Sequence, residues 1–366
     1  MKNYSATDIL RVAKRFNNRK RNYLLVNPLQ GKHLPTSPTA ALDMMSTLGE
    51  RVAENFPSAK LVIGFAETAT AIGAAVAKTL SDDCFYLQTT RETFDGNFVE
   101  FLEEHSHAPE QKLFAENFNV LLNDTPEVIF IDDELSTGKT LLNIVRRLKS
   151  EFPELVDKKI CAASIINRLS EENLSAFAAE NISCEYLVKL PQTPFDVERF
   201  TISPAQDVKP CGREVTEVLT CKISTNPRRG TTIGEFFSQC ETVGDKVAEM
   251  FVRRKISGEV VTIGTEEFML PAIIIGRRLQ RENLSVVTHS TTRSPIGVST
   301  DENYPIREGY GLRSFYDDTR RTFIYNPKFY DAAVIVTDAQ NFSAGLDDLI
   351  AALNVHGVGE IFIVRC

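Results

Sequence analysis

The chain has 366 residues, which indicates about two domains, because a single hydrophobic core seldom grows far past about 250 residues. Hydrophobic residues make up 43% of the chain and charged residues 25%, a composition that excludes intrinsic disorder, a collagen-like repeat and a small disulfide scaffold. The formal net charge of -8 argues against attraction of the whole surface to nucleic acid or to an anionic membrane.

The cysteines and the apolar segments indicate the compartment. Seven cysteines, an odd number without a CxxC pair, argue against a disulfide framework and against a zinc site. No apolar stretch approaches the roughly 20 residues that span a bilayer, and the basic start has no apolar run behind it that would be typical of a signal peptide. We therefore predict a reduced, cytoplasmic protein that does not bind a membrane.

In chain order, the first half opens with a basic run at residues 11–21, which indicates a solvated helix face or, as a second reading, a nucleic-acid contact. Short apolar runs then alternate with segments of helical spacing. We expect strands at residues 23–26, 60–63, 84–88, 128–131 and 159–166, and helices at residues 40–56, 69–80, 141–152 and 171–179. This alternation predicts a parallel α/β sheet with ligands at the carboxyl ends of its strands.

The chain also repeats itself. Five short segments recur in the same order at an offset near 200 residues, which predicts a tandem duplication of one α/β unit. The matching segments are residues 27–31 and 226–230, 48–56 and 243–251, 61–67 and 261–267, 89–91 and 291–293, and 128–132 and 334–338. Residues 201–226 carry prolines without a clear period and form the expected link. We predict domains at residues 1–210 and 211–366.

The sharpest motif is the sequence VIFIDDELSTGKT at residues 128–140. An apolar strand delivers two acids, and a Ser-Thr-Gly-Lys-Thr loop then opens a helix, whose first backbone amides suit a phosphate. The acids would repel that phosphate, so they suit the hydroxyls of an attached sugar or a Mg²⁺ ion. A nucleotide P-loop is excluded because Asp133 stands where that motif needs glycine. The structural alternative is a strand, a turn and a helix cap.

This segment resembles the phosphoribosyl pyrophosphate (PRPP) motif of type I phosphoribosyltransferases. The resemblance implies that Asp132 and Asp133 meet the ribose hydroxyls and hold Mg²⁺ directly or through water, and that Glu134 departs from the usual small or apolar residue. The residues implied to hold the 5-phosphate are Ser136, Thr137, Gly138, Lys139 and Thr140.

Further segments fit the same family less sharply. The resemblance implies a pyrophosphate loop at residues 64–69, often with a non-proline cis peptide, and a lid at residues 92–112. The implied pyrophosphate ligands are Ala66, Glu67, Thr68, Arg91 and Lys112, and Arg91 joins the two aspartates as a catalytic residue. A plain strand-to-helix turn and solvated lid side chains, His105 and His107 included, are the alternatives. Lys32 and His33 would cover the acceptor or PRPP, unless their segment is only a turn.

The second copy has lost part of this pattern. Aligning Asp338 with Asp132 sets Ala339 against Asp133, and no Ser-Thr-Gly-Lys-Thr loop follows, so we expect this degenerate copy not to turn over PRPP. The sequence Thr292-Arg293-Ser294-Pro295 marks an anion or partner site, or else a solvated loop. It resembles the signature of the TRSP domain, which follows an orotate-phosphoribosyltransferase-like domain in bacterial proteins associated with tellurite-resistance and stress-response gene clusters.

These resemblances imply Mg²⁺-dependent transfer of phosphoribose between PRPP and a nitrogenous, base-like acceptor in the synthesis or salvage of a nucleotide-like metabolite, and they imply a homodimer. The sequence does not assign the acceptor. One alternative is a PRPP-sensing or nucleotide-sensing regulator without catalysis, and another is a structural pseudoenzyme that does not bind PRPP.

Overall fold

A computed structural model describes residues 2–17, 21–101, 111–209, 215–341 and 344–366. The chain divides into two compact units that interleave along the sequence. Unit 1 contains Met1–Tyr4, Asp43–Thr193 and Ser224–Gln239, and unit 2 contains Ser5–Leu42, Pro194–Ile223 and Cys240–Cys366. The division at residue 210 stays a prediction about the sequence repeat, because the compact units do not follow one cut.

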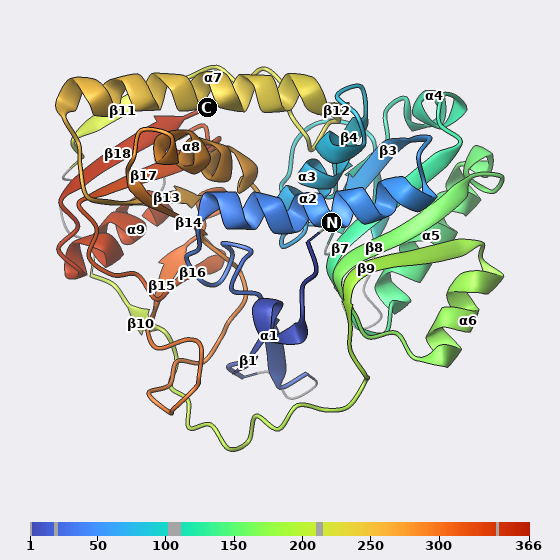
Figure 1. Ribbon diagram of the computed structural model, residues 1–366, viewed down its shortest axis with the longest axis horizontal. Coiled ribbons are helices and arrows are strands. Elements are labelled where there is room, and N and C mark those ends of the chain that lie inside the picture. Colours follow the sequence, from blue (N-terminus) through green and yellow to red (C-terminus); the bar gives the residue numbers. More distant parts are fainter. Residues whose placement is uncertain (1, 18–20, 102–110, 210–214, 342–343) are drawn as a thin grey trace. The chain divides into compact units, whose positions relative to one another are not determined.

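Unit 1 is built on a six-stranded sheet whose five long strands are parallel, as predicted for the first copy (Figure 1). In sheet order the strands are β12 (Thr231–Thr232), β4 (Phe85–Gln88), β3 (Ala59–Gly64), β7 (Glu127–Leu135), β8 (Lys159–Asn167) and β9 (Ile182–Lys189). The other elements are α3 (Thr70–Leu80), α4 (Phe118–Asn123), α5 (Lys139–Glu151), η1 (Pro153–Leu155), α6 (Glu171–Ala179) and the hairpin of β5 (Phe98–Phe101) and β6 (Gln111–Phe114).

Burial of β7 and α5 explains why the motif at residues 128–140 holds its shape. Val128, Phe130 and the rest of the apolar run in β7 are buried, and the apolar face of α5, including Leu141 and Leu148, joins the same core. Because the apolar part of β7 is buried in this core, the polar residues that follow it lie at the carboxyl edge of the sheet.

Unit 2 has a five-stranded parallel sheet and two smaller sheets. In sheet order the strands of the large sheet are β11 (Glu217–Thr220), β18 (Glu360–Arg365), β17 (Ala332–Thr337), β13 (Glu259–Gly264) and β14 (Ser285–Ser290). The remaining elements are α1 (Ala6–Ile9), β1 (Arg11–Lys14), β2 (Tyr23–Val26), β10 (Gln206–Asp207), α8 (Leu270–Gln280), β15 (Gly309–Arg313), β16 (Arg321–Tyr325) and α9 (Ala344–Val355). The long helices α2 (Pro38–Asn55) and α7 (Ile233–Arg254) each contain a unit boundary.

The N-terminal basic run is not a helix face, so that prediction was wrong. Residues 11–14 form strand β1, which pairs antiparallel with β2, and residues 18–20 lie outside the described residues. Pairing with β2 explains the difference, since Ala13 is buried with Leu24 and Val26 in a hydrophobic cluster of unit 2, while Arg11 is exposed and Lys14 is half-buried.

The two large sheets share a strand order. The series β4-β3-β7-β8 in unit 1 corresponds to β14-β13-β17-β18 in unit 2, and each series is parallel throughout. This match supports the inferred duplication. The fifth strand differs in origin, because β9 follows β8 along the chain whereas β11 precedes the other strands of its sheet.

Sheet register corrects the alignment of the two acid positions. The opposing pairs that fix it are Gly64 with Ile131 in unit 1 and Gly264 with Val336 in unit 2. Counting on from these pairs, Asp132 corresponds to Thr337 and Asp133 corresponds to Asp338. The sequence alignment, which set Ala339 against Asp133, was therefore wrong by one position. The second copy keeps an acid at the second place and has a hydroxyl at the first.

The recurring Asn-Pro segments are exchanged between the units. We call residues 27–36 the first arm and residues 226–232 the second arm. The first arm lies in unit 2, where Thr36 pairs antiparallel with Thr288 of β14. The second arm lies in unit 1, where its strand β12 pairs antiparallel with the corresponding strand β4. Each sheet therefore carries an arm from the other copy.

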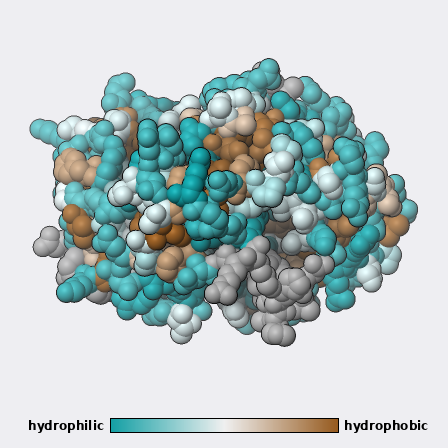
Figure 2. Space-filling view, turned by 90° about the horizontal axis from the view of Figure 1, so that it is seen from below, coloured by the Kyte–Doolittle hydropathy of each residue, from teal (hydrophilic) through white to brown (hydrophobic). Residues whose placement is uncertain are grey.

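None of the helices in the described ranges is long and apolar enough to cross a membrane. Hydrophilic residues dominate the face drawn in Figure 2, and hydrophobic ones occur between them in small groups.

Candidate functional site

The two acids of the motif lie at the carboxyl end of β7, where both are half-buried. The backbone N–H of Asp133 donates to Oδ1 of Asp132 at 2.9 Å. Loss of solvation, followed by repulsion from the neighbouring Asp133 carboxylate, raises the pKa of Asp132 well above its ordinary value. A group that donates hydrogen bonds to this pair, or a cation, would offset both effects.

The loop that follows the acids opens helix α5 as the sequence predicts. Gly138 has φ +71° and is buried, and a Cβ atom there would lie 2.6 Å from the Phe177 ring and 2.7 Å from Leu169. Only glycine fits this position without strain. The side chains of Thr137, Lys139 and Thr140 are exposed around the start of the helix, and Ser136 is half-buried. The loop thus presents hydroxyls, an ammonium group and helix-start amides together.

The predicted pyrophosphate loop lies against the acids. The Thr68 hydroxyl donates to Oδ1 of Asp133 at 2.8 Å, so the structure brings residues 66–68 and the motif of β7 together. The backbone N–H of Ala66 donates to Oγ1 of Thr89 at 2.8 Å. The peptide bond between Ala66 and Glu67 is cis, as the resemblance implied for this loop.

Glu134, the residue that departs from the family pattern, has a specific partner. Its Oε1 lies 3.5 Å from Nη1 of Arg168, and both side chains are nearly inaccessible to solvent. Arg168 also donates to the carbonyl oxygens of Pro191 at 3.2 Å and Thr193 at 2.8 Å. The charge of Glu134 is therefore compensated within the fold. The sequence signal for Arg168 is a single charged residue directly after an apolar strand.

Arg91 follows β4 and is half-buried at the same edge of the sheet. Lys112 lies in β6, where its backbone exchanges hydrogen bonds with Thr90 at 2.8 and 3.0 Å. Its ammonium group is 4.5 Å from the centre of the Phe98 ring. The structure thus places Lys112 beside the strand end that carries Arg91. His105 and His107 of the predicted lid lie outside the described residues.

Two family profiles match the chain. One, described as phosphoribosyl transferase, covers residues 9–191, half of the chain, and the other, described as the TRSP domain C-terminal to that transferase, covers residues 227–353. The chain belongs to this phosphoribosyl transferase family. No curated protein matches the sequence.

Solved structures similar to this chain include adenine phosphoribosyltransferases. The enzyme from Giardia lamblia is 16% identical with a TM-score of 0.36, over 50% of this chain and 96% of its own. The enzyme from Saccharomyces cerevisiae is 14% identical with a TM-score of 0.33, over 49% and 94%. The enzyme from Trypanosoma brucei is 16% identical with a TM-score of 0.32, over 41% and 66%.

Lys32 and His33, predicted to cover the acceptor or PRPP, make their described contacts in unit 2. The Lys32 side chain is fully buried, and its Nζ donates to the carbonyl oxygens of Glu266 at 2.8 Å and Thr291 at 3.0 Å. His33 is buried in the same arm. The sequence repeat shows that this arm recurs at residues 226–230. It does not show that each arm pairs with the sheet of the other copy.

The strand ends of the TRSP domain are tied together internally. The Tyr316 hydroxyl donates to Oδ1 of Asp338 at 2.5 Å and lies 3.0 Å from Oγ1 of Thr265, which in turn donates to the hydroxyl of Thr337 at 3.0 Å. The tyrosine therefore occupies the side of Asp338 that faces Thr265 and Thr337.

The Thr-Arg-Ser-Pro sequence contributes to packing in unit 2. The backbone of Thr292 pairs with that of Phe323, the Ser294 carbonyl accepts from the Tyr325 hydroxyl at 2.7 Å, and the Pro295 carbonyl accepts from the Phe16 N–H at 3.0 Å. Arg293 is half-buried between these anchored residues. An anion or partner site at Thr292–Pro295 stays a prediction.

We expect the TRSP domain to lose stability at acidic pH because of the buried side chain of His289. Its Nδ1 accepts from the Ser290 N–H at 2.8 Å, its Nε2 lies 2.7 Å from the Tyr325 carbonyl oxygen, and burial lowers its pKa from 6.5 to about 4. The unfolded chain therefore binds the proton first as the pH falls below 6.5, and stability is lost between these two values. From pH 7 to pH 5 we expect this residue to cost about 2 kcal/mol of unfolding free energy.

Urea unfolding of the wild type and of His289→Gln at both pH values checks this, because glutamine can still donate to Tyr325. The variant should lose less stability on acidification than the wild type. An equal loss in both proteins would show that the proton does not bind at His289.

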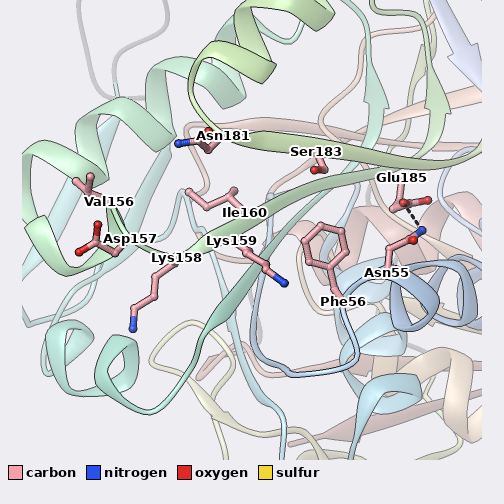
Figure 3. A pocket seen from close by; sticks show the side chains of 10 residues that line it. All are labelled: Asn55, Phe56, Val156, Asp157, Lys158, Lys159, Ile160, Asn181, Ser183 and Glu185. Carbon is pink, nitrogen blue, oxygen red and sulfur yellow. Dashed lines mark hydrogen bonds between the residues drawn. The ribbon is translucent and has the colours of Figure 1, made fainter.

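A separate pocket of about 670 Å³ opens at the amino ends of β8 and β9, the opposite edge of the unit 1 sheet (Figure 3). Lys159, Asn181 and Ser183 line it, and Nδ2 of Asn55 donates to Glu185 there at 2.8 Å. Burial raises the pKa of Glu185. None of the predicted site residues lines this pocket.

Proposed function

We propose that this chain transfers phosphoribose between PRPP and a nitrogenous, base-like acceptor, with Mg²⁺ bound. The contact between Thr68 and Asp133 carries the proposal, because it joins the predicted pyrophosphate loop to the predicted ribose-binding acids. The helix start at Gly138 lies directly after those acids along the chain. The predicted phosphate, ribose and pyrophosphate residues therefore lie at one edge of one sheet, which supports the proposal.

In the proposed reaction the bond between C1 of the ribose and pyrophosphate breaks, and the lone pair of an acceptor nitrogen forms the new bond to C1. Pyrophosphate leaves with the bonding electrons, so positive charge develops on the ribose. Asp132 and Asp133 accept hydrogen bonds from the ribose hydroxyls and orient the ring, while the amides of residues 136–140 anchor its 5-phosphate. Arg91 faces the charge of the leaving pyrophosphate. An acceptor nitrogen that is already nucleophilic supplies its lone pair without a strong base, and a proton bound to that nitrogen is released to water or to the leaving pyrophosphate.

The carboxylates of Asp132 and Asp133 are the type of ligand that Mg²⁺ prefers. Mg²⁺ in phosphate sites is held by one or two carboxylates together with substrate oxygens and water. Asp132 and Asp133 supply two adjacent carboxylates. The pKa of Asp132 is raised by loss of solvation and, after that, by repulsion from Asp133, and a cation would offset this repulsion. Among the described residues no group of three or more His, Cys, Asp or Glu side chains is placed to hold a metal by itself. A bound Mg²⁺ would supply charge neutralisation for pyrophosphate.

Calorimetric titration of the full chain with PRPP and Mg²⁺, followed by an assay of pyrophosphate release, tests the proposal. We expect binding of PRPP, and release with at least one acceptor from a panel of purines, pyrimidines and ring amines. Binding without release across the whole panel would instead favour the sensing regulator. Absence of any PRPP binding would contradict both readings and leave the structural pseudoenzyme.

A homodimer and a link to tellurite resistance or stress response, which the resemblance implies, stay predictions, as does the cytoplasmic location expected from the cysteines and apolar segments.

A further inference from the structure

We propose that Arg229, which belongs to the second sequence copy, is a positioning residue for the pyrophosphate side of the first copy's site. This inference rests on the proposed function for the identity of that site. Arg229 lies in the second arm, which is part of unit 1. Its role is to hold the segment that carries Arg91 and Lys112 against the sheet.

The second arm is fixed along β4, the strand that ends just before Arg91. Thr231 of β12 lies opposite Tyr86 of β4, and the backbone N–H of Gln88 donates to the Pro227 carbonyl at 2.9 Å. Gly230 has φ +87°, and a Cβ atom there would lie 2.4 Å from the Phe85 ring. The backbone on both sides of Arg229 is therefore placed closely against β4.

From this base the Arg229 side chain reaches the chain segment that follows Arg91. Its Nη2 donates to the Asp95 carbonyl at 2.8 Å. Its guanidinium group lies 4.8 Å from the centre of the Phe94 ring and 5.1 Å from that of Phe114 in β6. Phe98 completes the cluster, with its ring centre 4.9 Å from Phe94 and 5.6 Å from Phe114. The Arg229 guanidinium thus contacts two of the three rings of this aromatic cluster.

Strand β6, which Arg229 contacts through Phe114, is hydrogen-bonded to the predicted pyrophosphate site. Lys112 exchanges backbone hydrogen bonds with Thr90, the residue before Arg91. The Gln111 side chain accepts from the Thr89 hydroxyl at 2.7 Å, and that hydroxyl oxygen accepts from the backbone N–H of Ala66 in the pyrophosphate loop at 2.8 Å. Displacing β6 would therefore disturb both predicted sources of pyrophosphate contacts.

The two arms differ at this position. Asn27 and Asn226 begin equivalent turns, because the N–H two residues later donates to each asparagine side chain, at 2.9 and 3.0 Å. Counting from these turns, Gln30 of the first arm corresponds to Arg229. Gln30 is buried, whereas Arg229 is exposed and reaches outward to the aromatic cluster. The arginine is present only in the arm that serves the sheet with the intact PRPP motif.

The test compares Arg229→Gln and Arg229→Lys with Arg253→Gln in the full chain. Arg253 is a matched control because it is an exposed arginine of the second copy whose side chain donates to Glu217 at 3.0 Å, outside unit 1. Hydrogen exchange of residues 94–101 and 111–115 reads the restraint directly. The KM for PRPP and kcat read its effect on the site.

We expect exchange in these residues to rise about fivefold in Arg229→Gln, because a cation over two rings and one hydrogen bond at an exposed site contribute about 1 kcal/mol together. The KM for PRPP should rise by a similar factor while kcat changes less. Arg229→Lys keeps the charge and should lie between wild type and Arg229→Gln, and Arg253→Gln should match wild type.

Unchanged exchange in Arg229→Gln, or an equal change in Arg253→Gln, would overturn the inference. Faster exchange with an unchanged KM for PRPP would also overturn it, since Arg229 would then stabilise the hairpin without positioning the site. If the wild type does not bind PRPP, the proposed function fails, and the exchange comparison still decides whether Arg229 restrains β6.

Discussion

Replacing Asp132 and Asp133 together with asparagine will abolish PRPP turnover while the fold is retained. Asparagine keeps the size of each side chain but removes the negative charge that opposes the positive charge developing on the ribose. Electrostatic contacts of this kind each lower the activation free energy by about 3 kcal/mol or more. We therefore expect the rate of PRPP turnover to fall at least about 1000-fold. Pyrophosphate release from PRPP measures it. Removing two mutually repelling carboxylates should leave thermal stability unchanged or raised.

Asp338→Asn is the matched control for this variant. It changes the acid at the corresponding strand end of the TRSP domain, where Tyr316 donates to the carboxylate. We expect this variant to turn over PRPP at the wild-type rate. Wild-type turnover in the double variant of Asp132 and Asp133 would contradict the mechanism, and loss of turnover in Asp338→Asn would show that the second copy takes part.

The second large effect is expected from Gly138→Ala. The new Cβ atom would lie 2.6 Å from the Phe177 ring at a backbone φ of +71°, so the loop must shift to accommodate it. Backbone strain of about 1 kcal/mol and overpacking of about 1–3 kcal/mol add up to a loss of several kcal/mol in unfolding free energy. A shifted loop also misplaces the amides that hold the 5-phosphate, and PRPP affinity should fall by more than about tenfold.

Gly357→Ala separates these causes. Gly357 has a similar φ of +67°, but nothing lies within 4 Å of a Cβ atom there. Urea unfolding should show a loss of about 1 kcal/mol for Gly357→Ala and a larger loss for Gly138→Ala. Calorimetry should show a change in PRPP affinity only for Gly138→Ala. Equal losses of stability in the two variants would refute the packing argument at Gly138.

Much of the first copy was predictable because local pattern and tertiary packing agree there. The run of residues 128–131 is buried in a parallel strand, and the acids and phosphate loop follow it as expected. The contact between Thr68 and Asp133 could only be expected from the rule that strand ends meet at one edge of a parallel sheet. The burial that raises the pKa of Asp132 depends on packing neighbours that the sequence does not show.

Two predictions failed where long-range pairing overrides local pattern. The basic run became β1 because its antiparallel partner β2 lies beyond a turn. The place of Asp338 depends on sheet register, and similar apolar runs can be aligned one residue apart without any local sign of error. The role of Lys32 and His33 at the acceptor or PRPP stays a prediction, and their contacts in unit 2 could not be expected because a sequence repeat does not reveal which copy an arm pairs with.

The pairing of β12 with β4 limits how this chain can be divided. A protein truncated at residue 210 would lose β12, and the backbone N–H and C=O groups along that edge of β4 would be left open. Open edges of this kind recruit strands from other molecules and lead to aggregation. Residues 27–36 would lose β14 at the same cut. We therefore expect neither half to be a separable module, and we expect recombination in evolution to transmit both halves together.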